Sequence, residues 1–551
     1  MTAPREAHCI PFREIPRTSK LFAAFLDSFP RVSRYYAHPP TTEGVVSAAR
    51  EVRLDAGVRK DVVAILREQN ARFTSDKKLD AETARALDRL EAGAVAVVTG
   101  QQVGLFGGPM FSLYKAVSAI HCADAITRRG IEAVPIFWMA TEDHDLAEVD
   151  HVLWNTPQQL FVCKVAPPET EVGRSAGQAA FGLDLKEVVD GALRALEGPF
   201  AVAIGRVLQE SYAPGETYGS AFAKLMSRLL VGRGIIFLDP LDARLSRLAA
   251  PLYRRAIEEA DTLRNALLRR SKELADAGFH SQVRAARETT LLFRYVDGHR
   301  QPVRSKNGRF TAGLASFTRE QLLADIEKTP EAFTSNVLLR PVVEDTLLPT
   351  AAYIGGPAEI AYMAQAEVVY NQMLGRMPAV LPRASFTIVE PGIARLLAKY
   401  GLDVRDVFRG RQRLRTKMER AALPRRLAQC FESDEKRLRR MLKDYEAPLE
   451  NLDLTLLGAL RTTESKMVYQ FQKLRGKAGR AENARTGVLD RHERMVRSAL
   501  CPEGDLQERR LCALPFLAAY GPEFLGKLKQ LAKIPAEPED SCGYCHQIVT
   551  L

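Results

Sequence analysis

Two continuous apolar runs near residue 100 predict neighbouring strands of a parallel sheet. Residues 94–99 (AVAVVT) and 134–140 (VPIFWMA) are apolar at nearly every position, which is typical of strands buried on both faces. A glycine-rich loop follows the first run, and a helix is expected to begin near Pro109. Because parallel α/β sheets bind ligands at the carboxyl ends of their strands, we expect the polar segments after both runs to border one site.

The following elements are predicted to continue this α/β domain and to interrupt it with insertions. Residues up to about 90 have a helical apolar period, and GIIFLDP (234–240) has the pattern of another strand that runs into a helix. A β-like period covers 151–185. One long helix is expected over about 245–277, and Asp297-Gly298 between β-rich runs predicts a hairpin.

Two later segments complete the predicted sheet domain. LRPVVEDTLLPT (339–350) is expected to be strand-like and to lead into a second glycine-containing loop and a helix. AVLPRASFTIVE (379–390) is expected to form one strand that closes the domain.

Beyond this domain the pattern changes to long charged helices with apolar residues at heptad-like spacing. Residues 391–505 therefore predict an α-helical coiled-coil arm of two antiparallel helices. The α/β core is expected to span 1–390, with insertions at about 151–215 and 255–330. Residues 506–551 are expected to form a C-terminal helix and tail that return to the core.

Composition and charge narrow the classes of partner. The 551 residues are too many for one hydrophobic core, and no run approaches the roughly 18 apolar residues of a transmembrane helix. The net charge of +11 is concentrated in 391–500, which contain 26 Lys and Arg against 14 Asp and Glu. This stretch has no aromatic platform for stacking bases. We therefore expect solvated basic helices in a cytoplasmic protein, with no membrane partner and no nucleic-acid partner.

The loop after the first predicted strand is a candidate anion-binding site. Glycine lets backbone N–H groups approach an anion at the start of a helix, and Lys115 is a lone cation on an otherwise apolar helix. A buried lysine requires an anionic partner, either a structural carboxylate or a bound substrate. The alternative is a tight turn that needs glycine for packing. The candidate binding residues are Thr99, Gly100, Gln101, Gln102, Gly104, Gly107, Gly108 and Lys115.

Four titratable residues, Glu142, Asp143, His144 and Asp145, follow the second predicted strand. Alternate side chains of extended backbone share a direction, so a carboxylate can orient His144 to take a proton from an attacking amine. We expect Glu142, Asp143 and His144 to be catalytic, and Asp145 to bind substrate or nucleotide. The alternatives are a solvated loop in which Asp145 caps the next helix, and a metal site, for which consecutive residues form a poor cage.

A second glycine pair opens the helix that follows residues 339–350. Side chains at helical spacing after this pair lie near one face and are suited to bind sugar hydroxyls or an amino group. Packing of the turn against the sheet is the alternative. The candidate binding residues here are Tyr353, Gly355, Gly356, Glu359, Tyr362 and Gln365.

The cysteines are scattered, which predicts reduced thiols rather than a disulfide framework. They lie at positions 9, 122, 163, 430, 501, 512, 542 and 545. Cys542, Cys545 and His546 form a C-x-x-C-H motif, but haem attachment would require export, which no N-terminal segment signals. We expect free tail thiols and no metal, with zinc at these three residues as the alternative, since it would need a further ligand.

Three motifs give the chain a family resemblance that covers almost its whole length. TGQQVGLFGGP, WMATEDHDLAEV and LRPVVEDTLLPTAAYIGGPAEIAYMAQ resemble the bacterial bacillithiol-synthesis family of cysteine ligases. The resemblance implies a Rossmann-like parallel-sheet core with connecting insertions, and a coiled coil that serves in homodimerisation. It also implies the addition of cysteine to the amino group of glucosaminyl-malate, so both compounds are the expected substrates.

The implied reaction raises the question of a nucleotide. An amide does not form spontaneously from a free carboxylate in water, so the cysteine carboxylate must be activated, most simply as an acyl adenylate. The motifs require no cofactor, because the P-loop, G-x-G-x-x-G, H-I-G-H and K-M-S-K-S patterns are absent. ATP or ADP is the candidate that the resemblance implies. A nucleotide-binding regulatory protein and a nucleic-acid-binding coiled-coil protein are the alternative functions.

Overall fold

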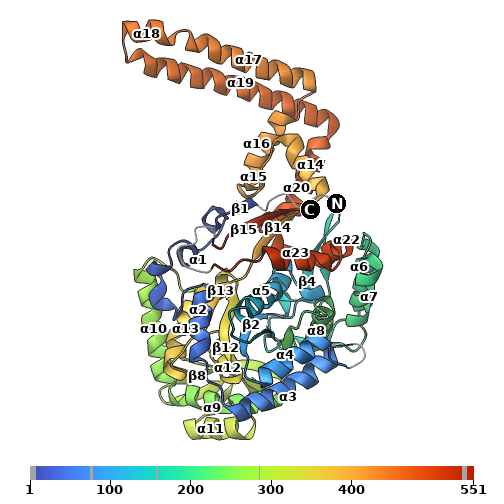
Figure 1. Ribbon diagram of the computed structural model, residues 1–551, viewed down its shortest axis with the longest axis vertical. Coiled ribbons are helices and arrows are strands. Elements are labelled where there is room, and N and C mark those ends of the chain that lie inside the picture. The colour runs from blue at the N-terminus through green and yellow to red at the C-terminus, as the bar shows by residue number, and fades with distance from the viewer. Residues whose placement is uncertain (1–7, 75–77, 157–158, 285, 536–542) are drawn as a thin grey trace.

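Five parallel strands form the central sheet and confirm the expected α/β class. A computed structural model describes residues 8–74, 78–156, 159–284, 286–535 and 543–551 (Figure 1). The strand order is β13-β12-β2-β3-β6. These strands are β2 (Val95–Gln101), β3 (Ala133–Met139), β6 (Ile236–Leu238), β12 (Thr350–Gly355) and β13 (Ala379–Pro382).

The winding of the sheet reverses at β2, which makes the gap between β2 and β12 a topological switch point. β3 and β6 follow β2 on one side, whereas β12 and β13 lie on the other. Two helices, α5 (Met110–Thr127) and α13 (Pro357–Met373), begin directly beyond the ends of β2 and β12. Ligands of open parallel sheets bind at such a point, beyond the carboxyl ends of the strands. The fold therefore locates the candidate site before any side chain is considered.

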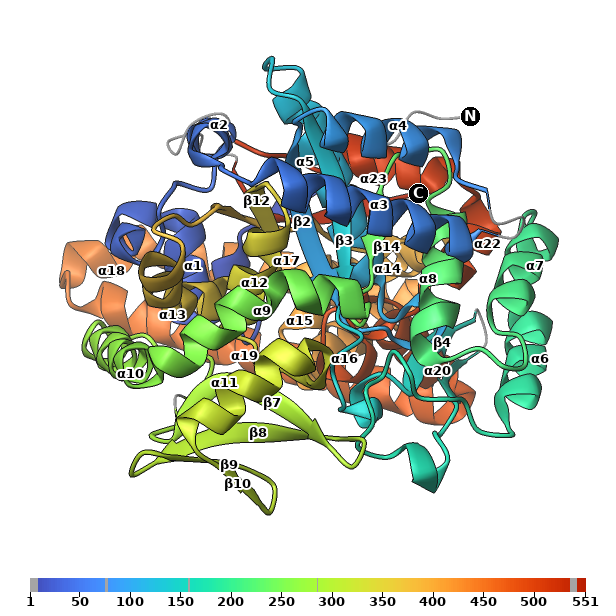
Figure 2. The ribbon, with the colours of Figure 1, turned by 90° about the horizontal axis from the view of Figure 1, so that it is seen from below.

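A second sheet, fully antiparallel, is inserted before β12. The predicted hairpin around Asp297-Gly298 is confirmed, because both residues have positive φ, 50° and 79°, as a two-residue hairpin turn requires. Figure 2 shows this sheet along one edge of the body, next to α9 (Ala243–Glu258) and α11 (Arg319–Lys328). Its order is β10-β9-β8-β7-β11. The strands are β7 (Thr289–Val296), β8 (His299–Lys306), β9 (Arg309–Ala312), β10 (Ala315–Phe317) and β11 (Phe333–Ser335).

Two expectations for local structure are wrong. Most of 339–350 forms helix α12 (Arg340–Leu347) instead of a strand, because a short run of mostly buried residues fits either element, and six of these eight residues are buried. The long helix expected over 245–277 is divided at Glu259 into α9 and α10 (Ala260–Asp276).

The strand expected over 379–390 is also divided, with a consequence for the C-terminus. Arg383 and Ala384 separate β13 from β14 (Ser385–Val389), and β14 leaves the central sheet. β14 pairs with β15 (His546–Thr550), which in turn pairs with β1 (His8–Ile10). The first and last described strands therefore belong to one small sheet with β14. The domain is not closed at Glu390, as was expected.

The helical arm is confirmed as a coiled-coil projection from the body. Its long helices α17 (Arg425–Lys443) and α19 (Leu456–Thr486) pack against each other and extend away from the core (Figure 1). At the base, α19 packs on α16 (Arg411–Ala421), and α20 (Val488–Leu500) leads back to the body. No helix in the described part of the chain is long and apolar enough to span a bilayer.

The expectations for the tail cysteines are wrong in the described part. Cys545 is joined to Cys9 by a disulfide between the segments that carry β15 and β1. Both ring nitrogens of His546 are within hydrogen-bond distance of hydroxyls, Ser385 at 2.7 Å and Thr387 at 2.8 Å. Neither residue is thus available to the zinc alternative, whose third member, Cys542, lies outside the described residues. No cluster of three or more potential metal ligands occurs among the described residues.

The crossing of α16 and α19 depends on one close approach of the two backbones. A Cβ added to Gly479 would lie 2.0 Å from the carbonyl oxygen of Glu419. Gly479→Ala should therefore lower the free energy of unfolding by about 1–3 kcal/mol, since overpacking forces the helices apart. Gly476→Ala, on the same helix, would meet only the end of the Arg480 side chain at 3.7 Å and should raise it by up to about 1 kcal/mol. Denaturant unfolding checks both, and effects of the same sign would contradict the crossing.

Candidate functional site

A cavity of about 740 Å³ lies at the topological switch point and contains many of the predicted site residues. It is bordered by the ends of β2 and β3, the first turns of α5 and α13, and the inserted antiparallel sheet. The predicted residues that line it are Gly100, Gln101, Gln102, Lys115, Glu142, Asp143, Gly356, Glu359 and Tyr362. Residues from the first and second glycine segments and from the acidic segment therefore meet in one pocket.

Lys115 lies at the centre of the pocket floor. Its Nζ donates to the carbonyl oxygen of Gly100, to Oε1 of Gln101 and to Glu359, each at 2.7 Å. Burial lowers the pKa of this ammonium group to about 8, although the Glu359 carboxylate opposes the shift. The sequence left open whether the anionic partner was structural or a substrate, and the partner in the protein is Glu359.

Glu359 connects this lysine to the end of β12. It stands at the third position of α13, where Oε2 accepts from the backbone N–H of the N-cap residue, Gly356, at 2.6 Å. Oε1 accepts from the hydroxyl of Tyr353 at 3.0 Å. Tyr353 and Tyr362 in turn accept from Nη2 of Arg340, at 3.1 and 2.7 Å. Tyr353 thus lies directly behind the pocket wall and holds two of its charged residues.

Glu142 is the buried acid of the pocket. Its residue surface is 8% exposed, and its carboxylate has no hydrogen-bond partner among the described residues, yet it lines the cavity. Burial raises its pKa to about 7, a shift that the guanidinium groups of Arg300 and Arg340 oppose. A carboxyl with this pKa exchanges a proton near neutral pH, as a general acid or base must.

The other members of the acidic segment have different environments. Asp143 accepts at Oδ2 from Nε2 of Gln102 at 2.7 Å, so this acid is held by the end of the first glycine segment. His144 does not line the cavity and its side chain is 41% exposed; its Nδ1 lies 3.4 Å from Nη1 of Arg300. Asp145 also lies off the cavity, and its side chain makes no cap to the following turn. Of the four, Glu142 and Asp143 line the pocket.

Several predicted binding residues serve the scaffold around the pocket. Gly104, Gly107 and Gly108 form a buried tight turn, in which a Cβ on Gly104 would lie 2.8 Å from Cα of Gly108. Gly107 and Gly108 have φ of 85° and 70°. These three glycines fit the packing alternative, because none of them lines the cavity.

Three further candidates also connect structural elements without lining the cavity. Thr99 donates its hydroxyl to the carbonyl of Ile354 at 2.8 Å and so ties β2 to β12. Gln365 exchanges two hydrogen bonds of 2.8 Å with the backbone of Val283. The carbonyl of Gly355 accepts from the backbone N–H of Arg383 at 2.8 Å.

Four arginines that are not among the candidates expected from the sequence also line the pocket. These are Arg300, Arg340, Arg383 and Arg509. Arg300 is on β8 of the inserted sheet, and the other three come from α12, the link between β13 and β14, and a helix after the arm. Arg340 and Arg383 are isolated cations beside apolar runs, which is the same pattern that marks Lys115 as a candidate. Arg300 and Arg509 lie in polar segments that carry no comparable signal.

Most of the cations that line the pocket form an ion pair with a glutamate. Lys115 pairs with Glu359, Arg340 with Glu344 at 3.0 Å, and Arg383 with Glu508 at 2.7 Å. Arg300 has no carboxylate partner among the described residues. It donates instead to Oγ1 of Thr334 at 2.8 Å and the carbonyl of Ser335 at 2.7 Å, and its guanidinium stacks 3.9 Å from the ring centroid of Phe293. The site is therefore a cationic pocket with one buried, titratable acid.

A Rossmann-like core with a pocket at its switch point, together with a coiled-coil arm, defines the class of this protein. The family model for bacillithiol biosynthesis BshC, N-terminal Rossmann-like domain, matches residues 6–384. The model for the C-terminal coiled-coil domain of the same family matches residues 386–537. The chain belongs to the bacillithiol biosynthesis BshC family.

Curated relatives are similar over nearly their whole length. A protein of Koribacter versatilis is 40% identical over 95% of this chain and 97% of its own. One of Solibacter usitatus is 37% identical over 93% and 95%, and one of Salinibacter ruber 32% over 98% and 99%. Each is named "Putative cysteine ligase BshC". A solved Campylobacter jejuni structure, titled as an arginyl t-RNA synthetase, aligns with a TM-score of 0.21 and 10% identity, which supports no argument.

The ion pair on the pocket floor should show strong energetic coupling. Lys115→Met should lower the free energy of unfolding by about 2–4 kcal/mol, because it leaves Glu359 charged and without its cation. Adding Glu359→Gln should recover part of this loss, with a coupling of roughly 1–3 kcal/mol in the double-mutant cycle. Glu142→Gln in place of Glu359→Gln is the matched control and should be additive, since Glu142 does not bond Lys115. An additive Lys115–Glu359 pair would contradict the arrangement.

Proposed function

We propose that this protein is a ligase that joins cysteine, through an amide bond, to the amino group of glucosaminyl-malate. One observation carries the proposal: Glu142, a buried acid, shares a pocket with the cation of Arg300, and within the described part of the chain the acid has no hydrogen-bond partner and the cation no ion-paired carboxylate. The substrate offers the complementary groups, an amine and a malyl dicarboxylate. Membership of the bacillithiol biosynthesis family supports this choice among amide-forming reactions.

Arg300 is the group that we assign to a malyl carboxylate. Its bonds to Thr334 and Ser335 and its stacking on Phe293 fix the plane of the guanidinium. A fixed guanidinium binds a carboxylate through two parallel hydrogen bonds, and no carboxylate of the described residues forms an ion pair with this one. The inserted antiparallel sheet would thereby contribute substrate recognition to the Rossmann-like core.

Glu142 is the group that we assign to proton transfer, in preference to His144, because it lines the cavity. The substrate amine is protonated in water and must lose a proton before it attacks. A carboxylate with a pKa of about 7 accepts that proton at neutral pH. The neutral amine then attacks the activated carboxyl carbon of cysteine, the new C–N bond forms, and the leaving group departs with the electron pair of the bond that breaks and takes up the second proton that the nitrogen loses. ATP is the candidate source of this activation.

The assignment of Glu142 predicts a change in rate with a defined pH dependence. The wild-type kcat should rise with pH through about 7 as Glu142 loses its proton, because only the carboxylate accepts a proton. Glu142→Gln should lower kcat by about 10²–10⁴-fold and abolish this rise. Product is measured by mass spectrometry with ATP, cysteine and glucosaminyl-malate.

The matched control is Glu148→Gln, a carboxylate that also lines the cavity but is bonded to Gln102 at 2.7 Å. This variant should keep kcat within a few fold and retain the pH profile. A Glu142→Gln enzyme with the wild-type profile would refute the assigned role, and absence of product from the wild type would refute the ligase proposal.

We further propose that the arm forms a homodimer. Apolar side chains remain exposed along it, with Leu427, Met441, Met467 and Leu474 between 39% and 55% exposed. Met441, Met467 and Leu474 border one groove between α17 and α19 that also contains the ring of Phe471. A continuous apolar surface of this kind on a coiled coil is typical of a partner interface, and a second copy offers the same surface.

Dimerisation should be abolished by charge in this groove. Met467→Glu combined with Leu474→Glu should convert the protein from dimer to monomer in sedimentation at micromolar concentration, because two buried carboxylates would oppose association. Leu314→Glu, at a fully exposed tip of the inserted sheet, is the control and should leave the dimer intact. A monomeric wild type would exclude the proposal.

A further inference from the structure

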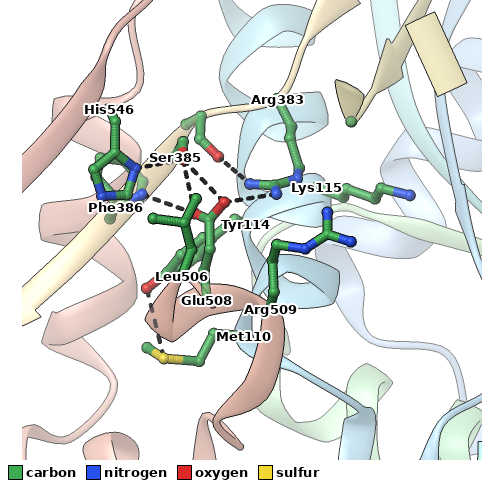
Figure 3. Close-up of polar contacts among 12 residues, drawn as sticks. Met110, Tyr114, Lys115, Arg383, Ser385, Phe386, Leu506, Glu508, Arg509 and His546 are labelled. Carbon is green, nitrogen blue, oxygen red and sulfur yellow. Dashed lines mark hydrogen bonds and ion pairs between the residues drawn. The ribbon is translucent and has the colours of Figure 1, made fainter. Parts of the chain in front are cut away.

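A helix that follows the arm contributes one residue to the wall of the pocket and a second, buried residue next to it. Helix α21 (Gln507–Arg510) packs against α5 and β14. Arg509 lines the cavity, and the preceding residue, Glu508, is 1% exposed. Figure 3 shows the Arg509 side chain on the same side of the network as Lys115 and Arg383, with Glu508 between this group and Ser385. The segment after the coiled coil is therefore part of the pocket wall.

Both carboxylate oxygens of Glu508 accept hydrogen bonds from Arg383, in the link between β13 and β14, and from the first two residues of β14. Its Oε1 accepts from Nη2 of Arg383 at 2.7 Å, and Ser385 donates its hydroxyl at 2.9 Å. Its Oε2 accepts from the backbone N–H of Phe386 at 3.0 Å. Burial alone would raise the pKa of Glu508, but the Arg383 guanidinium and these hydrogen bonds hold it below its usual value. Glu508 is thus a permanent buried anion.

His546, on the last described strand, is connected to this anion through Ser385. Ser385, which donates to Glu508, accepts in turn from Nδ1 of His546, whose Nε2 accepts from Thr387. Burial lowers the pKa of His546 to about 4, so the ring is neutral near pH 7. Arg383 is then the cation in direct contact with Glu508, and the remaining contacts orient the carboxylate.

One N–H group of Arg383, a residue that lines the pocket, is not used in a hydrogen bond within the described part of the chain. Its side chain is 5% exposed, and Nη1 donates to the carbonyl of Ala384 at 3.0 Å. Its Nε has no acceptor among the described residues and lies 3.5 Å from the position of a Cβ on Gly356, at the start of α13. Lys115 is close enough that Arg383 lowers its pKa. A buried guanidinium with an unused N–H, next to a second cation and a helix amino terminus, is suited to an anion.

We propose that Glu508 is a positioning residue that holds Arg383 as the binding group for an anionic oxygen of the ligand. The anion is a carboxylate or a phosphate, and Arg509 provides a second cation at the same wall. The inference extends the proposed function, since it takes the cavity as the substrate site. Without the negative charge of Glu508, the guanidinium would be repelled by Lys115 and would lose its orientation.

Calorimetric titration of the full-length protein tests this role without turnover. Sodium malate is the carboxylate probe and ADP the phosphate probe. Arg383→Gln and Glu508→Gln should each weaken binding of at least one probe about tenfold or more, the effect of losing a charge-assisted hydrogen bond. The double variant should be no weaker than either single variant, because both changes remove one interaction. The probe that loses affinity identifies the anion.

Two controls separate positioning from general destabilisation. Glu493→Gln removes a carboxylate that is 2% exposed and paired with Arg411 and Arg415 at the arm base. It should lower the melting temperature and leave both affinities unchanged. Ser385→Ala removes one donor of Glu508 and should weaken the same probe by a smaller factor. This variant decides the matter if Glu508→Gln does not fold.

The proposal is overturned if Arg383→Gln weakens a probe while Glu508→Gln and Ser385→Ala do not, or if none of these variants changes either affinity. Additive losses from Arg383→Gln and Glu508→Gln would also overturn it. A protein that shows the non-additive loss yet forms no amide would refute the ligase function and leave the positioning role of Glu508 intact.

Discussion

The ion pair between Lys115 and Glu359 is the contact on which the pocket depends. Lys115 lies on α5 and bonds the end of β2 through Gly100, whereas Glu359 lies on α13 and bonds Gly356 at the end of β12. The ion pair therefore joins the two helices that follow β2 and β12, strands that are also paired by their backbones and through Thr99. A parallel sheet opens a crevice beyond the carboxyl ends of these strands, and both residues of the pair line it.

The cations of the pocket differ in whether a protein carboxylate holds them. The lysine and two arginines at its floor are each held by a glutamate from behind, so their positions are set by the protein. The glutamate behind Arg340 balances it only in part, because burial raises the pKa of Glu344. Among the described residues Arg300 forms no ion pair with a carboxylate, so its remaining hydrogen-bond donors are open to a ligand anion. The pocket thus combines cations that are held by glutamates with one guanidinium, that of Arg300, whose charge is available to a ligand.

Local sequence pattern predicted the strands that carry the site but not most of its charges. The runs 94–99 and 134–140 are recognisable as strands because each is continuously apolar. The first leads into the glycine loop and the second into the acidic segment, a pattern with few other interpretations. Helix α12 differs from the expected strand because six of its eight residues are buried, and a short buried run does not distinguish a helix from a strand. Arg300 and Arg509 were missed because their role depends on distant contacts. The pairing of Cys9 with Cys545 joins residues 536 positions apart, which no spacing rule reveals.

The position of Glu508 explains why the coiled-coil arm interrupts the chain where it does. Arg383 ends the Rossmann-like portion of the sequence, and its carboxylate partner follows 125 residues later, after the whole arm. A buried guanidinium without that partner carries an uncompensated desolvation cost. The α/β core therefore gains its last pocket charge in a defined orientation only when α21 has returned and β15 has paired with β14. The pocket is a product of the complete topology, although nearly all of its lining residues precede the arm.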